Sequence, residues 1–319
     1  MNKLTINTPA KSITAKSVAT TLLTLTVVVT IAATAWKMQQ QHDLTAPLKS
    51  FPFVAGTLLA ILYRITNPFA WNLVIRGLGH KVSVENSTRI WLLAESRRWL
   101  PGGIWGYTSR AIAAKEIGLN KTTASTSMAI ELLVTIVAAA CVSMIGVTIH
   151  YKELQSTVSE LTKTSSLNSG LLPGILIVSI AGAVVVLLLR NTLQQKIQNV
   201  IQKFKSLRGV NLQTNWLVAS VAYLILMAAL NGTINSVLLN AVSSQNVPMI
   251  AMIAATATAW IIGFFAFFSP GGILVREAAL AALLLPWLPY ETGFALAILS
   301  RFAQLFAEVI GMGLAAWKR

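Results

Sequence analysis

The chain has 319 residues, of which 55% are hydrophobic and only 11% are charged. A soluble domain carries about 25% charged residues, so the composition argues against a soluble enzyme. The formal net charge of +15 would suggest a nucleic-acid partner in a soluble protein. In a membrane protein the same excess of Lys and Arg gathers on the cytoplasmic side and sets the orientation. We therefore expect an integral membrane protein without a nucleic-acid partner.

The first apolar stretch, 17–36, follows three lysines at positions 3, 11 and 16. The Ala-Thr-Ala at 33–35 resembles a signal-peptidase site. However, the stretch is about 20 residues long, which is longer than a usual signal-peptide core and long enough to span a bilayer. We expect a retained first helix, with a cleaved signal peptide as the alternative.

Five further spanning helices follow along the chain. They are predicted at about 51–74, 122–149, 171–190, 215–239 and 292–317. A Ser- and Thr-rich segment at 151–170 is predicted to be a polar loop, and the basic segment at 190–214 a cytoplasmic surface helix that rests on anionic lipid headgroups. The predicted fold is an all-α polytopic membrane protein in one domain, 1–319, with about six full spans.

Two copies of the tetrapeptide Pro-Gly-Gly-Ile, at 101–104 and 270–273, each join a pair of shorter apolar segments. The pairs are 87–100 with 104–117, and 249–268 with 273–286. A helix of roughly 14 residues rises only about 21 Å, less than the hydrocarbon core of about 30 Å. Each pair is therefore predicted to be a short broken or re-entrant helical hairpin, covered by protein. The stretch 249–268 is also long enough for a complete crossing, which remains the alternative.

The placement of positive charge predicts the orientation. We place both termini in the cytoplasm, with the first hairpin entering from the cytoplasm and the second from outside. Then 18 Lys and Arg residues face the cytoplasm and 4 face outside. This asymmetry obeys the positive-inside rule.

The two hairpins belong to repeat-like units at about 87–149 and 249–317. Each tetrapeptide is followed by an arginine, Arg110 or Arg276, and then by a charge within a full span. Glu131 lies 30 residues after the first proline, and Arg301 lies 31 residues after the second. Inverted repeats with broken helices are a transporter architecture. Chance or plain helix termination is the alternative explanation for a four-residue match.

Four charged residues are candidates for intramembrane function: Glu131, Glu277, Arg301 and Glu308. A charge in a helix centre costs about 2.5–3.5 kcal/mol on insertion scales, so such residues usually face a cavity or a partner. We predict a role at the substrate site or in proton coupling. The alternative is that Glu131 and Glu308 pair with Arg301, Arg276 or Arg64 and hold helices together.

The turns and the arginines near them form the candidate headgroup-binding set. Glycine lets the backbone approach a ligand, a helix N-terminus favours an anion, and guanidinium groups match phosphate. The set comprises Arg97, Arg98, Pro101, Gly102, Gly103, Arg110, Pro270, Gly271, Gly272 and Arg276. Plain turns and ordinary cytoplasmic charge are the alternatives.

Other polar and aromatic residues have simpler predicted roles. Asn231 and Asn235 lie one helical turn apart and favour interhelical hydrogen bonding, with a polar pathway as the alternative. Trp91, Trp99 and Trp105 are interpreted as interfacial anchors.

No cofactor or metal is expected. The three histidines fall in polar connections, and Cys141 lies in an apolar helix. No phosphate-binding GxxxxGK[ST] loop is present, so nucleotide hydrolysis is not expected.

The sequence around these candidates resembles the lysylphosphatidylglycerol synthase transmembrane-region family, also called the flippase-like domain, over roughly 50–317. The resemblance rests on Arg98–Gly106 with Arg110, on Ser125–Glu131, on Pro270–Glu277, and on Arg301 with Glu308. Leu274 departs from the pattern, since the family often has glycine there. The resemblance implies movement of lipids between leaflets. A chain ending at Arg319 has no room for the soluble synthase domain, so lysyltransferase activity is not expected.

The leading hypothesis is a translocase of an anionic phospholipid or a polyprenyl-phosphate-linked lipid, in envelope biogenesis at the bacterial cytoplasmic membrane. Its expected partners are membrane lipids and enzymes of envelope biosynthesis. The oligomeric state is undetermined. One alternative is a membrane-embedded glycosyl or headgroup transferase, with Glu131 or Glu308 as general base. The other is a non-transporting partner of an envelope-glycan enzyme.

Overall fold

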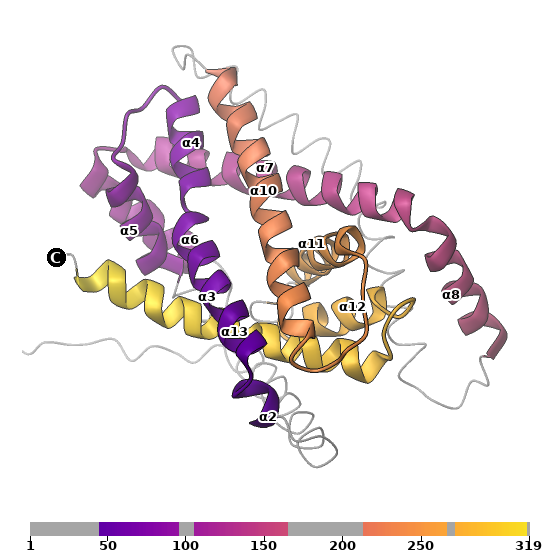
Figure 1. Ribbon diagram of the computed structural model, residues 1–319. Coiled ribbons are helices and arrows are strands. Elements are labelled where there is room, and N and C mark those ends of the chain that lie inside the picture. Colours follow the sequence, from indigo (N-terminus) through magenta and orange to yellow (C-terminus); the bar gives the residue numbers. More distant parts are fainter. Residues whose placement is uncertain (1–44, 96–104, 165–212, 267–271, 318–319) are drawn as a thin grey trace, which may run out of the picture.

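The computed structural model describes residues 45–95, 105–164, 213–266 and 272–317, and within these ranges the chain is helical without strands (Figure 1). Four helical stretches in these ranges are long and apolar enough to cross a membrane. They are Phe51–Gly77, Lys121–Ile149, Thr214–Leu239 and Tyr290–Trp317. The chain is therefore an all-α, multi-pass membrane protein, as predicted. The predicted spans at 17–36 and 171–190 lie outside the described residues, as does 190–212.

The first described span is a broken helix. It follows the short helix α2 (Thr45–Leu48) and consists of α3 (Phe51–Thr66) and α4 (Phe69–Gly77). Ser50 caps α3 by accepting a hydrogen bond from the Phe53 amide. Pro68 precedes α4 and has no N–H to donate, so the helical ladder is interrupted between the two. The sequence predicted one continuous helix here and did not identify this break.

Helix α10 (Thr214–Leu239) forms the centre of the packing. It contacts α3, α4, α7 (Lys121–Ile149) and α11 (Met249–Phe265), and it crosses the molecule between them in Figure 1. Gly232 lets α10 and α11 approach closely, because a Cβ there would lie 2.5 Å from the Ile253 Cα. Small residues at close crossings are typical of helix packing in membranes.

The two repeat-like units pack reciprocally. The first contains α5 (Val84–Glu95), α6 (Trp105–Ala113), the 3-10 helix η2 (Ala114–Ile117) and α7. The second contains α11, α12 (Val275–Leu283) and α13 (Tyr290–Trp317). The first helix of each unit packs on the long helix of the other: α5 contacts α13, and α11 contacts α7.

The short helices of the two units lie at opposite ends of α13 (Figure 1). Leu92 of α5 lies against Gly311 near the C-terminal end of α13. Ala281 of α12 lies against Gly293 near its N-terminal end. Helices α5 and α12 therefore pack on opposite ends of α13, and the inverted repeat stays a prediction. Helix α11 has 17 residues and rises about 25 Å, which favours a short arm over a complete crossing.

One predicted loop is a helix. The segment at 151–170 contains α8 (Tyr151–Thr164). Its Ser and Thr content suggested a loop, but in the sequence the apolar residues Leu154, Val158 and Leu161 recur at the spacing of an amphipathic helix. The prediction was wrong because composition was given more weight than periodicity.

We predict that Gly232→Ala lowers the thermal stability of the detergent-solubilised protein, because the new methyl group must displace the backbone of α11. Overpacking of this kind costs about 1–3 kcal/mol. Gly313→Ala is the matched control, since Gly313 is also helical but has nothing within 4 Å of a Cβ. Equal unfolding temperatures for the two variants would contradict the close crossing.

Candidate functional site

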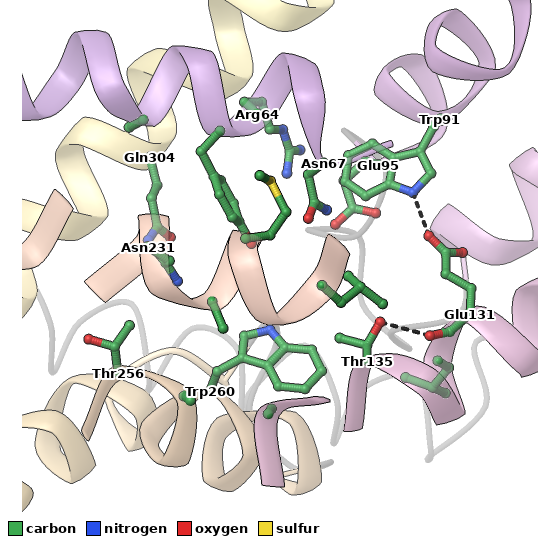
Figure 2. Close-up of a pocket in the computed structure, with 18 of the residues that line it drawn as sticks. Arg64, Asn67, Trp91, Glu95, Glu131, Thr135, Asn231, Thr256, Trp260 and Gln304 are labelled. Carbon is green, nitrogen blue, oxygen red and sulfur yellow. Dashed lines mark hydrogen bonds between the residues drawn. The ribbon is translucent and has the colours of Figure 1, made fainter. Parts of the chain in front are cut away.

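A cavity of about 190 Å³ lies among the helices and is lined by residues from α3, α5, α6, α7, α10, α11, α12 and α13 (Figure 2). Arg64 lies on its wall and is the middle residue of the span Phe51–Gly77. The cavity is thus near mid-depth along that span. Its wall includes three arginines, two glutamates and three side-chain amides: Arg64, Arg110, Arg276, Glu95, Glu131, Asn67, Asn231 and Gln304.

Glu131 on α7 is held by two donors from the first unit. The Arg110 guanidinium donates to Oε2 at 2.5 Å, and the Trp91 indole N–H donates to Oε1 at 3.1 Å. Arg110 in turn lies over the Trp71 ring, 4.7 Å from its centroid. Arg110, Glu131 and both tryptophans are buried. The alternative reading of the sequence paired Glu131 with Arg301, Arg276 or Arg64, and its observed partner is instead Arg110.

Glu308 on α13 accepts a hydrogen bond from the Arg64 guanidinium on α3 at 2.6 Å. Both side chains are buried. Arg64 also lies over the Trp91 ring, 5.0 Å from its centroid. This ion pair is one of those that the sequence offered as the structural alternative, and it ties the first described span to the last.

The neighbouring residues Arg276 and Glu277 at the start of α12 have different partners. Arg276 lines the cavity and donates to the Gln304 Oε1 at 3.2 Å. Glu277 instead forms an ion pair with Arg301 on α13, whose Nε lies 3.0 Å from the Glu277 Oε1, beside a smaller adjoining cavity. Of the two charged residues that follow the second turn, Arg276 is therefore the candidate for binding a lipid headgroup, while Glu277 joins α12 to α13.

The two units carry ion pairs of opposite polarity at matching places. In the first unit the arginine is on the short helix α6 and the glutamate, Glu131, on the long helix α7. In the second unit the glutamate is on the short helix α12 and the arginine, Arg301, on the long helix α13. Glu131 and Arg301 lie 30 and 31 residues after the prolines of the two turns. The two ion pairs therefore lie at corresponding places in the two predicted repeat units, with their signs exchanged.

The second turn requires unusual backbone geometry. Gly272 has φ of 67°, and a Cβ there would lie 2.7 Å from the Gly263 carbonyl oxygen. Leu274 also has φ of 67°, in a region that is strained for a branched side chain. This explains why glycine suits that position better than leucine. The candidates at 97, 98, 101–103, 270 and 271 lie outside the described residues.

The structure revises two further predictions about single residues. Trp91 is not an interfacial anchor, because it is buried and hydrogen-bonds to Glu131. Asn235 does make the predicted interhelical hydrogen bond, from Nδ2 to the Thr256 Oγ1 at 2.8 Å. Asn231 instead lines the cavity. Trp105 is exposed, as an anchor would be.

Several cavity residues were not among the sequence candidates. Glu95 and Gln304 are polar residues within apolar segments, so the rule that found Glu131 could have found them. Trp260 and Tyr63 carried no such signal, because aromatic residues are common in apolar helices. Only the packing of the helices brings them to one cavity.

A comparison with protein families matches residues 15–311 to the family described as lysylphosphatidylglycerol synthase TM region. The matched range contains every residue of the cavity wall. Comparisons with curated proteins and with solved structures give no match.

We predict that Arg64→Met destabilises the protein more than the double variant Arg64→Met with Glu308→Leu. Removing one partner of a buried ion pair leaves an uncompensated charge and costs about 3–5 kcal/mol, whereas replacing both partners with apolar groups is far milder. Thermal unfolding in detergent measures both variants and Glu308→Leu alone. Additive losses from the two single variants would mean that the side chains are not coupled.

Proposed function

Because the chain belongs to the lysylphosphatidylglycerol synthase transmembrane-region family, we propose that it is a lipid translocase. It moves an anionic phospholipid or a polyprenyl-phosphate-linked lipid between the leaflets of a bilayer. The observation that carries this proposal is the cavity near mid-depth, whose wall combines charged, amide and aromatic side chains. A polar wall at this depth lowers the barrier that hydrocarbon presents to a headgroup.

The size of the cavity suits part of a lipid headgroup. At about 30 Å³ for each water molecule, 190 Å³ holds roughly six waters. A phosphate with a small polar substituent occupies similar space. The acyl or prenyl tails would stay in the surrounding lipid while the headgroup passes through the protein.

Arg276 is the best-supported residue for holding the phosphate. It lines the cavity and donates a hydrogen bond to Gln304, which also lines it. A guanidinium presents five N–H donors in a fork that matches phosphate oxygens. Arg110 lines the same cavity while bound to Glu131. A phosphate could compete with that carboxylate for the guanidinium.

The ion pairs offer a route to coupled movement. Glu131, Glu277 and Glu308 each bind an arginine on another helix. Protonation of any of these carboxylates would weaken its ion pair and loosen the two helices that it joins. Protonation of the carboxylates at different times would let the two units open at different steps, as alternating access requires.

We place the protein in the bacterial cytoplasmic membrane with both termini inside, on the strength of the 18-to-4 distribution of positive charge. Enzymes of envelope biosynthesis would supply or use the translocated lipid. The transferase alternative receives less support, because Glu131 and Glu308 are both held in ion pairs. A general base needs access to the proton that it removes.

We predict that Arg276→Gln reduces translocation about tenfold or more without lowering protein abundance, because hydrogen bonds to charged groups contribute about 1.5–3 kcal/mol. The assay reconstitutes the protein in liposomes containing a fluorescent anionic lipid and measures how fast inner-leaflet label becomes accessible to a quencher. Arg76→Gln is the matched control, since Arg76 lies over Trp216, outside this cavity.

Two results would contradict the proposal. One is an unchanged rate of label exposure for every anionic lipid when the wild-type protein is present. The other is equal activity of Arg276→Gln and the wild type. Release of a transferase product by the purified wild type would support the enzyme alternative instead.

A further inference from the structure

One end of the cavity contains a buried amide whose oxygen has no partner in the part of the chain that the structure describes. Asn231 is 8% exposed and lines the cavity. Its Oδ1 has no hydrogen-bond partner among the described residues. Leaving a buried polar group unpaired costs about 1–3 kcal/mol. A polar occupant of the cavity would remove that cost.

The neighbours of Asn231 offer complementary hydrogen bonds. The Thr256 hydroxyl accepts from Asn235, so its own proton can be donated. The Gln304 carbonyl accepts from Arg276, so its amide N–H groups can serve another acceptor. Figure 2 shows Asn231, Gln304 and Thr256 at one end of the cavity, and Glu131 at the other. Trp260 lies between them, with its indole ring in the cavity.

This set of groups selects for hydroxyls. A hydroxyl donates and accepts through one atom, so it can pair with an amide oxygen, an amide N–H or another hydroxyl. It also fits the Asn231 amide in either orientation. An ammonium can only donate, and it would be repelled by Arg276 beside this end. A carboxylate can only accept, and would leave the Asn231 oxygen unpaired.

We infer that this end of the cavity binds a hydroxyl-rich group next to the phosphate of the translocated lipid. Its hydroxyls pair with Asn231, Thr256 and Gln304, its C–H surface lies on Trp260, and its phosphate lies at Arg276. That the hydroxyl-rich group belongs to a lipid rests on the proposed function. Two lipids offer the chemistry: phosphatidylglycerol through its glycerol, and a prenyl phosphate through an attached sugar.

Such a site would distinguish lipids by the hydroxyl groups of their headgroups rather than by their charge. A site built to hydrogen-bond a substrate hydroxyl rejects the analogue that lacks it, because its buried polar groups are then unpaired. Phosphatidylmethanol is the matched analogue, since it has the phosphate charge of phosphatidylglycerol without hydroxyls. The wild type is expected to prefer phosphatidylglycerol or a glucosyl prenyl phosphate over phosphatidylmethanol by about tenfold or more.

The test measures equilibrium binding of each lipid to the full-length protein in detergent, together with translocation of each in liposomes. Asn231→Leu, which keeps the side-chain size, is expected to reduce the hydroxyl preference several-fold, because Asn231 is one of the three residues that pair with the hydroxyls. Asn231→Ala provides a second variant that adds no apolar volume. Asn240→Leu is the control, because Asn240 is exposed at the end of the same helix.

The outcomes separate this inference from the proposed function. Equal binding of phosphatidylglycerol, glucosyl prenyl phosphate and phosphatidylmethanol by the wild type would overturn the inference, while translocation of all three would leave the translocase intact. A preference that is as large in both Asn231 variants as in the wild type would also overturn it. Selective binding without translocation of any lipid would support the hydroxyl site and overturn the translocase. The lipid with the larger preference identifies the source of the hydroxyls.

Discussion

A charge at mid-depth in a bilayer must have a partner, and this requirement organises the described part of the protein. Arg64 and Glu308 are 244 residues apart in sequence and form a buried ion pair between the first described span and the last. Neither side chain would be tolerated alone in hydrocarbon at low cost. Their pairing ties α3 to α13 and places Arg64 on the wall of the cavity. The same contact therefore stabilises the bundle and contributes a charged group to the candidate site.

The other two ion pairs show how a repeated unit can be kept while its charges are exchanged. In each unit an arginine and a glutamate join the short helix after the turn to the long helix that follows. The Coulomb attraction between two opposite charges is the same whichever helix carries which sign. Exchange of the signs therefore preserves the helix contact.

The sequence-based predictions succeeded mainly for features that depend on residues close together in the chain. Helices α7, α10 and α13 begin and end within about two residues of their predicted bounds, which is the usual spread in the assignment of helix ends. The agreement is good because apolar length and caps are local properties. Helix α8 was missed although its apolar spacing was also local. The role of Trp91 could not be predicted, since an indole in an apolar helix looks the same whether it faces lipid or a buried carboxylate.

The sequence by itself determined that the chain crosses a membrane, where its main spans lie and which charges fall within them. It also predicted two repeat-like units. These properties depend on composition, helical length and spacing along one chain. Only the tertiary structure decided which arginine binds which glutamate, that Arg276 faces the cavity while Glu277 does not, and that Asn231 meets Trp260 there. Partner choice depends on the direction in which each helix face points after packing, and that direction is set by contacts between helices far apart in sequence.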